Sequence, residues 1–131
     1  MMTILYADDD NEDQEVFAEI ILAIDPNIKI LRAADGLKTL DILSGTVVPN
    51  IIFLDVNMPF LDGYQALEEI RKDDKFKNTE VIIYSTNVYQ KTYDEYASLN
   101  ARYLRKPNTL SEGIATLRTI IETENTNISR T

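Results

Sequence analysis

Short apolar segments recur along the chain and predict the strands of a sheet. They cover residues 3–7, 28–33, 51–54, 81–84 and 101–104. The third and fourth are unbroken apolar runs rich in Ile, which is typical of strands buried on both faces of a parallel sheet. The fifth is weaker but stops before Pro107, which lacks the backbone N–H that a sheet requires. The pattern therefore predicts five strands.

Between these segments the apolar residues recur at helical spacing, which predicts five helices. The helices are expected from about Asn11 to Ile24, around Leu37 to Leu43, from Asp62 to about Asp74, from Tyr89 to Leu99 and around Ile114 to Ile121. Pro26 closes off the first helix, Gly45 is the expected C′ glycine of the second, and Asp62 is a candidate N-cap of the third.

The alternation of strand and helix predicts an α/β fold, with a doubly wound, open parallel sheet and helices on both faces. The length of 131 residues fits one domain, expected at residues 1–124, followed by a polar tail at 125–131 and no output domain. Ligands in such folds bind beyond the carboxyl ends of the strands, where the strand order reverses. The functional site is thus expected just after Ala7, Leu54, Tyr84 and Leu104.

Composition narrows the chemistry that this site can carry. A hydrophobic fraction of 44% supplies a core, and the absence of Cys and His excludes disulfides, zinc–thiolate sites and histidine as a general base. A formal net charge of -9 disfavours direct binding to nucleic acid. The apolar runs are too short to span a membrane, and the N-terminus lacks a basic secretory leader. We therefore expect a cytoplasmic protein without a membrane partner.

Acidic residues are concentrated at the N-terminus, where residues 1–28 hold eight acids and no Lys or Arg. Asp8, Asp9 and Asp10 directly follow the first strand. Carboxylate oxygens in this number suit a hard divalent ion such as Mg²⁺. The same acids could instead cap and solvate the first helix, and this run alone does not decide between the two interpretations.

Polar residues also follow the other strands that are expected to border the site. Asp55 follows the third strand and opens the run D-x-x-M-P-x-x-D-G. Ser85 and Thr86 follow the fourth strand, and Lys106 and Pro107 follow the fifth. Acids, a hydroxyl and a lysine are therefore expected at one edge of the sheet.

Together with the acidic pair after the first strand, these motifs follow the order and spacing of a known family. From Ile4 to about Ile121 the chain resembles the receiver domains of two-component response regulators, in particular the single-domain, chemotaxis-regulator-like ones. The resemblance implies a flavodoxin-like sheet with strand order 2-1-3-4-5. It also implies a phosphorelay switch that uses Mg²⁺ and assists only its own phosphorylation and dephosphorylation, without being an enzyme for other substrates.

The resemblance also assigns roles to individual residues. Asp55 is the expected phosphoacceptor, and Ser85 and Lys106 are expected to contact the phosphoryl oxygens. This set suits phosphoryl transfer, because catalysis there is mostly positioning and neutralisation of charge on the phosphoryl oxygens. The expected Mg²⁺ ligands are Asp8, Asp9 and the backbone carbonyl of Asn57.

Other residues are implicated in how the switch works. Ser85 and Tyr103 are expected to move together on phosphorylation, and the Lys106–Pro107 peptide bond is expected to be cis. The candidates for tuning the phosphoryl lifetime are Asn57, Thr86 and Asn87. Asn108 occupies a position where the family frequently has an aromatic residue, so the resemblance does not predict the packing around it. The remaining acids expected to cap and solvate the first helix are Asp10, Glu12, Asp13 and Glu15.

Because the chain has no His, its phosphoryl group must come from another protein. The resemblance implies a histidine kinase or a histidine phosphotransfer protein as donor. It also implies an unidentified downstream protein that binds the fourth helix, fifth strand and fifth helix, where a homodimer could also form. Two alternatives stay open: a small aspartyl-phosphate phosphatase or phosphotransferase, and a receiver-like interaction module that needs no phosphorylation. The presence of Asn57 argues against the phosphatase alternative, since such enzymes usually carry a general acid two residues after the nucleophile.

Overall fold

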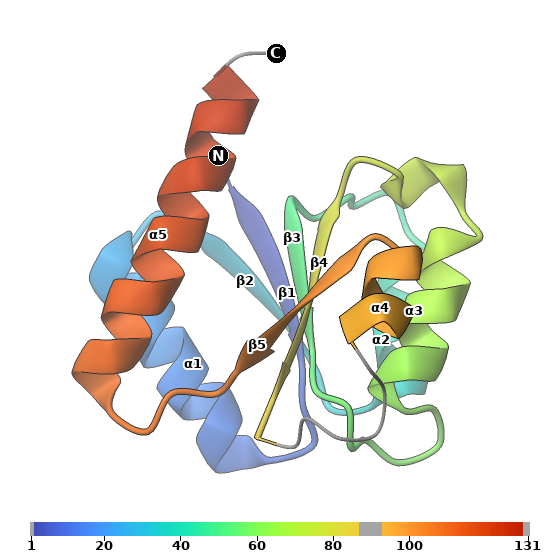
Figure 1. The fold of residues 1–131 in the computed structure, drawn as a ribbon, viewed down its shortest axis with the longest axis horizontal. Helices are drawn as coiled ribbons and strands as arrows, with labels where there is room; N and C mark the ends of the chain where they lie inside the picture. The colour runs from blue at the N-terminus through green and yellow to red at the C-terminus, as the bar shows by residue number, and fades with distance from the viewer. Residues whose placement is uncertain (1, 87–92, 130–131) are drawn as a thin grey trace.

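The computed structural model describes residues 2–86 and 93–129 as strands and helices in alternation (Figure 1). The strands are Thr3–Ala7 (β1), Lys29–Ala33 (β2), Ile51–Leu54 (β3), Glu80–Ser85 (β4) and Ala101–Arg105 (β5). The helices are Asn11–Ile24 (α1), Gly36–Leu43 (α2), Gly63–Arg71 (α3), Tyr93–Ser98 (α4) and Leu110–Ser129 (α5), with a 3-10 helix at Asp74–Phe76 (η1). The start of the fourth predicted helix, residues 89–92, lies outside the described residues.

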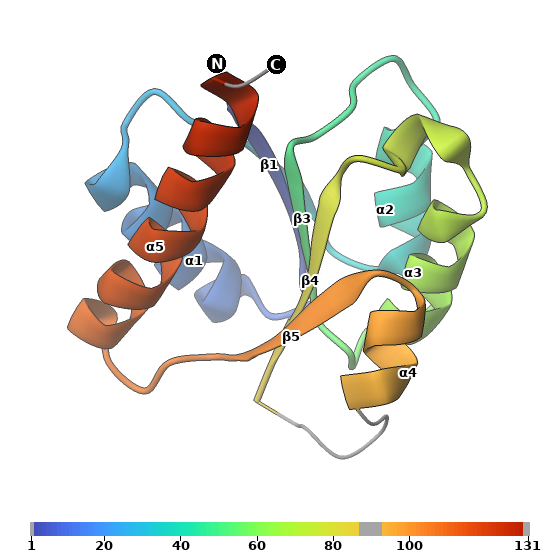
Figure 2. The same ribbon diagram turned by 45° about the horizontal axis from the view of Figure 1, so that its top comes forward.

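All five strands pair in parallel, in the order β2-β1-β3-β4-β5. Helices α1 and α5 cover one face of this sheet, and α2, α3 and α4 cover the other (Figures 1 and 2). This arrangement confirms the predicted doubly wound fold and its strand order. The order reverses between β1 and β3, so the carboxyl ends of these two strands border the crevice where such folds bind ligands.

Side chains on the strands alternate between two apolar layers. Ile4 and Tyr6 of β1 belong to the layer beneath α1 and α5, whereas Leu5 and Ala7 belong to the layer beneath α2 and α3. All four residues of β3 are fully buried, as the unbroken apolar run predicts. The sheet is therefore fixed from both sides, and the residues that follow its strands are held at a rigid edge.

Aspartate side chains begin three of the helices. Asp10, Asp35 and Asp62 each accept a hydrogen bond from the backbone N–H three residues further on. At Asp62 the bond is reciprocal, because the Gln65 side chain accepts from the backbone N–H of Asp62. Such caps pair N–H groups that the first turn of a helix leaves without partners. The prediction of Asp62 as an N-cap is confirmed.

Helix α3 ends at Arg71, three residues before the predicted end at Asp74. The side chain of Asp73 accepts a hydrogen bond from the backbone N–H of Lys75, which starts the tighter turn η1. The Arg71 guanidinium fixes this turn and the neighbouring loop by donating to the backbone carbonyls of Phe76, Thr79, Leu99 and Asn100. Two of these bonds reach residues 28 and 29 positions away, which the apolar spacing of the helix does not predict.

Gly45 occupies the predicted C′ position, directly after Ser44 at the end of α2. Its φ is not positive, however, so it does not form the left-handed turn expected of a C′ glycine. The N–H of Gly45 instead donates to the carbonyl of Ile42 at 3.3 Å, which closes the helix with a tight turn.

Helix α5 runs to Ser129, so residues 125–129 of the predicted polar tail continue the helix, whereas residues 130–131 lie outside the described residues. Residues 114–129 contain neither Gly nor Pro, and nothing in this stretch interrupts a helix. Thr119, Thr123 and Thr126 each donate a side-chain hydroxyl to the carbonyl four residues earlier. Across residues 2–86 and 93–129, every helix is too short or too polar to cross a lipid bilayer.

Candidate functional site

Three aspartates meet where β1 and β3 end. Asp8 and Asp55 are buried, with 1% and 7% of their surface exposed, whereas Asp9 is exposed. One carboxylate oxygen from each lies within 4.8 Å of the others. The sequence-based prediction that Asp8, Asp9 and Asp55 come together is confirmed by this geometry.

Lys106 supplies positive charge to this acidic cluster from the end of β5. Its side chain is 10% exposed, and its Nζ donates to Oδ2 of three carboxylates, on Asp8 at 2.7 Å, Asp13 at 2.9 Å and Asp55 at 3.0 Å. Burial by itself lowers the pKa of the ammonium, but the bonds to Asp13 and Asp8 and the charge of Asp55 outweigh it and raise the pKa above its usual value. Lys106 therefore stays charged at neutral pH.

Opposing effects act on the pKa of the phosphoacceptor candidate Asp55. Burial raises its pKa above the usual range, while the charge of Lys106 and its hydrogen bond act in the opposite direction. The nearby charge of Asp8 raises the pKa further. The backbone N–H of Asn57 donates to Asp55 Oδ1 at 3.2 Å, which leaves Oδ2 turned towards Lys106. Additional positive charge at this position would favour the ionised, nucleophilic form of Asp55.

Asp8 is fixed by groups that the sequence did not identify. The Tyr6 hydroxyl donates to Asp8 Oδ2, and the backbone N–H of Asp10 donates to Oδ1 at 3.0 Å. Burial, followed by the hydrogen bond to Asp8, raises the Tyr6 pKa far above its usual value, so this hydroxyl remains a donor. Gln14 of α1 donates from Nε2 to the carbonyls of Tyr6, Asp8 and Ala33, which ties the first helix to the end of β1.

The loop from β3 to α3 passes close to Asp55 and requires a glycine. A Cβ at Gly63 would fall inside van der Waals contact with the backbone carbonyl of Asp55. The N–H of Gly63 donates to the carbonyl of Val56 at 3.0 Å, which seats the start of α3 directly behind the aspartate. The Asp-Gly pair that ends the D-x-x-M-P-x-x-D-G run thus supplies a helix cap and a close contact.

Ser85 is buried at the end of β4, where its backbone carbonyl receives two hydrogen bonds. The Tyr103 hydroxyl donates to it at 3.1 Å, and the backbone N–H of Lys106 donates at 3.0 Å. Tyr103 also stacks on Tyr96 of α4, with ring centroids 6.0 Å apart. Thr86 is exposed after the strand. Asn87, a candidate for tuning lifetime, lies outside the described residues.

The peptide bond between Lys106 and Pro107 is trans, which corrects the prediction of a cis bond. Proline makes the cis isomer accessible but leaves trans favoured by about 0.5–1 kcal/mol, so an X-Pro pair at a strand end does not itself require cis. In the trans form the N–H of Lys106 pairs with Ser85, and its side chain still reaches the acidic cluster.

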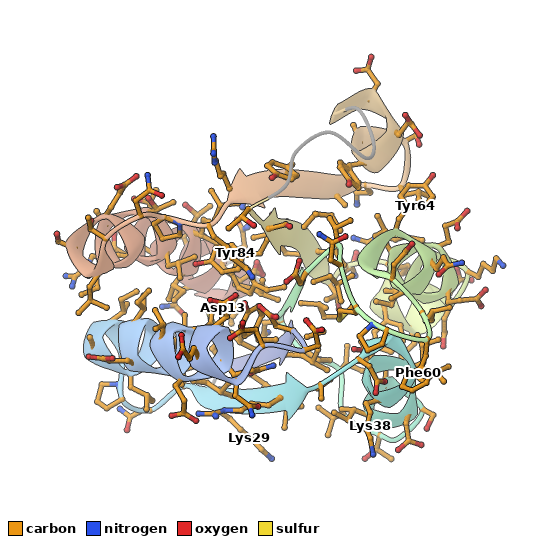
Figure 3. The ribbon with its side chains drawn as sticks, turned by 90° about the horizontal axis from the view of Figure 1, so that it is seen from below. Asp13, Lys29, Lys38, Phe60, Tyr64 and Tyr84 are labelled. Atoms are coloured by element: carbon orange, nitrogen blue, oxygen red, sulfur yellow. The ribbon has the colours of Figure 1, made fainter. Side chains whose placement is uncertain are left out.

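Asp13 is a site residue that the sequence analysis placed on the helix surface. Its backbone N–H donates to the side chain of the N-cap residue Asp10, but its carboxylate binds Lys106. Figure 3 looks onto the carboxyl ends of the strands and shows Asp13 at this edge, between α1 and the segment that leads to α5. Its position in the first turn of α1 was predictable, whereas a partner 93 residues away was not.

The donor set fits a hard divalent cation. Asp8, Asp9 and Asp55 offer oxygen ligands at close range, and their mutual repulsion is only partly relieved by Lys106. Mg²⁺ binds through one or two carboxylates together with waters, and the exposure of Asp9 leaves an open side for water. The chain has no Cys or His, so no thiolate or imidazole is available to favour a softer metal.

Comparison with known proteins agrees with this geometry. Residues 4–118 match the family described as the response regulator receiver domain. Protein PilG of Pseudomonas aeruginosa is 34% identical over 91 residues, which cover 68% of this chain and 66% of PilG. The sensor histidine kinase CheAY of Helicobacter pylori is 34% identical over 86 residues, 65% of this chain but only 10% of that protein. This chain thus spans less than two thirds of either relative.

A solved structure with the same fold is the Mn²⁺-bound form of response regulator Rcp1. The two chains superpose with a TM-score of 0.78 at 25% sequence identity, over 92% of this chain and 91% of the other. A protein of that name is known from Synechocystis.

Proposed function

The chain belongs to the response regulator receiver domain family of two-component signalling, and we propose that it is a switch that accepts a phosphoryl group on Asp55. The observation that carries this proposal is the arrangement of charge around Asp55. A buried carboxylate lies 3.0 Å from the Lys106 ammonium and within 4.8 Å of two further acids. Such a site brings a nucleophile and cationic groups to the same phosphoryl oxygens.

In the proposed reaction an Asp55 carboxylate oxygen attacks the phosphorus of a phosphohistidine on another protein. A P–O bond forms, the P–N bond breaks, and the histidine nitrogen takes up a proton. Lys106 and the Ser85 hydroxyl would then each contact a phosphoryl oxygen. Mg²⁺ held by Asp8, Asp9 and the backbone carbonyl of Asn57 would neutralise negative charge on the phosphoryl group. A Mn²⁺-bound form of response regulator Rcp1, which has the same fold, supports the binding of a divalent metal.

Phosphorylation would be transmitted through Ser85 and Tyr103. Tyr103 lies in the middle of β5, beside β4, and the hydrogen bond from its hydroxyl to the backbone carbonyl of Ser85 couples the two residues. A phosphoryl group that contacts the Ser85 side chain would favour the conformation in which Ser85 approaches Asp55, and Tyr103 would follow. The surface of α4, β5 and α5 would change accordingly, and a downstream protein or a second copy would bind there. Thr86, together with Asn57 and Asn87, would tune how long the phosphoryl group survives.

The donor would be a histidine kinase or a phosphotransfer protein in the cytoplasm, since the chain contains no His. The domain would act on its own aspartyl phosphate and on no other substrate. At the position two residues after Asp55, where small phosphatases of the aspartyl type carry a general acid, Asn57 contributes a backbone N–H. This favours a switch over an enzyme with turnover.

A phosphate analogue tests the assignment of Asp55. With Mg²⁺ and beryllofluoride, the wild-type protein should give a bound ¹⁹F NMR signal that is lost in Asp55→Asn, because the analogue requires the carboxylate oxygen. Asp41→Asn is the matched control, since it removes an exposed aspartate from α2 and should keep the signal. A signal that persists in Asp55→Asn, or sustained hydrolysis of a small phosphate ester by the wild type, would overturn the proposed function.

A further inference from the structure

Asp13 differs from the other acids that bind Lys106. It comes from the first turn of α1, and its side chain is 43% exposed, whereas the side chains of Asp8 and Asp55 are 0% and 10% exposed. It is not among the three aspartates whose oxygens cluster within 4.8 Å. Its carboxylate is joined to the site by the ion pair with the Lys106 ammonium, at 2.9 Å.

The hydrogen bonds of Lys106 are fully used in this arrangement. An ammonium group has three N–H donors, and the three carboxylates accept one each. A phosphoryl oxygen on Asp55 can take the place of the Asp55 carboxylate oxygen as a partner of Lys106, and any further bond to the phosphoryl group requires that the bond to Asp8 or to Asp13 is given up. Of these two, the bond to Asp13 is the one to yield, because an exposed carboxylate regains water when it is released, whereas buried Asp8 does not.

Charge acts in the same direction as this competition. The incoming phosphoryl group is a dianion, and the ammonium that would bind it is already paired with the negative charge of Asp13. Both effects weaken the contact between Lys106 and a phosphoryl oxygen. On the basis of the proposed function, we propose that Asp13 is a positioning residue that holds Lys106 in the unphosphorylated protein and opposes phosphoryl binding at Asp55.

The test is a measurement of the affinity for beryllofluoride at saturating Mg²⁺, in which backbone amide NMR shifts report binding. Asp13→Asn should bind the analogue more tightly than the wild type, by a factor of about 1.5 to 5, the range expected when a partly exposed ion pair is removed. Its fold should be retained, because the backbone N–H that Asp10 caps is still present. Asp13→Glu restores a carboxylate at the same position and should return the affinity towards that of the wild type.

Glu12→Gln is the matched control, because it removes one exposed acid from the same turn of α1. Its affinity for beryllofluoride should equal that of the wild type. The inference is overturned if Asp13→Asn binds no more tightly than the wild type, or if Glu12→Gln tightens binding equally, since net charge alone would then be responsible. Failure of the proposed function looks different: the wild type would not bind the analogue, or Asp55→Asn would bind it as well.

Discussion

Four consecutive or nearly consecutive aspartates show how one residue type acquires different roles. Asp8 is buried and bonded to Tyr6, Asp9 is an exposed member of the acidic cluster, and Asp10 caps α1. Asp13, one turn later, pairs with Lys106. Their differences follow from where each stands relative to the end of β1 and the start of α1, since the side chains themselves are identical.

Phe60 is conspicuous among single residues in the loop that follows Asp55. Its φ is 68°, in the left-handed region that a side chain with a Cβ seldom adopts, and its side chain is 80% exposed. The label in Figure 3 places it at the outer side of this loop. Asn100, the other non-glycine residue with positive φ among those described, has a side chain that tolerates this conformation better.

Phe60→Asn should therefore raise the free energy of unfolding by about 1 kcal/mol, because Asn relieves part of the backbone strain and little packing is lost. Urea denaturation followed by circular dichroism measures the change. Phe60→Ala is the control, as it removes the ring but keeps a Cβ without a polar group at the same φ. If the Ala variant gained as much stability as the Asn variant, exposure of the ring and not the backbone would be the cause.

At the scale of elements, close contact between a helix and a strand decides where α3 begins. Gly63 follows the Asp62 cap and leaves no room for a side chain against the backbone of Asp55. Gly45, at the end of α2, has only an ordinary contact, since a Cβ there would lie 3.5 Å from the carbonyl of Ile42. The two glycines consequently have different importance, although both flank a helix.

Gly63→Ala should destabilise the protein by about 1–3 kcal/mol, because the new methyl group meets a backbone carbonyl that cannot move aside without shifting β3 or α3. Thermal unfolding gives the change. Gly45→Ala is the matched substitution in an open position, and its stability should match or exceed that of the wild type. Equal stability of the two variants would contradict the close approach of α3 to Asp55.

The element boundaries also show what local pattern can and cannot predict. The ends of α1, β1 and β3 coincide with those predicted, because Pro26 and runs of apolar residues define them locally. The end of α3 was predicted three residues too late, and the bonds that its last residue, Arg71, makes to Leu99 and Asn100 have no signal in the local pattern. The extent of α5 was underestimated, because its last turns are polar and have no apolar periodicity to mark them.

At the scale of the molecule, the layer beneath α1 and α5 contains an aromatic cluster beside the site. Tyr84 of β4 lies edge-on to Tyr6, Phe17 and Phe53, with ring centroids 5.6–5.8 Å apart. Burial raises the pKa of Tyr84 to about 12. The packing of this layer thus keeps the phenol neutral in the folded protein. The free energy of unfolding therefore depends on pH in the alkaline range.

Stability should fall as the pH rises from about 10, the ordinary pKa of tyrosine, towards 12. In this window the unfolded chain releases the Tyr84 proton while the folded protein retains it, so deprotonation favours unfolding by up to about 1.4 kcal/mol per pH unit. Denaturant unfolding between pH 9 and pH 12, at about unit steps, measures the slope. Tyr84→Phe should have a shallower slope than the wild type, and an unchanged slope would show that Tyr84 is not responsible.

The sequence by itself determined the succession of strands and helices along the chain and the two-sided burial of β3, because both depend on local periodicity. It also determined which residues follow each strand, and parallel strands end at one edge of a sheet. It thereby placed Asp8, Asp9, Asp55 and Lys106 together. Only the tertiary structure decided that Asp13 shares Lys106, that Tyr6 holds Asp8 and that the bond before Pro107 is trans. The first of these joins residues 93 positions apart, and the other two depend on the conformation of individual side chains and of the backbone. The spacing of residue types along the chain specifies neither.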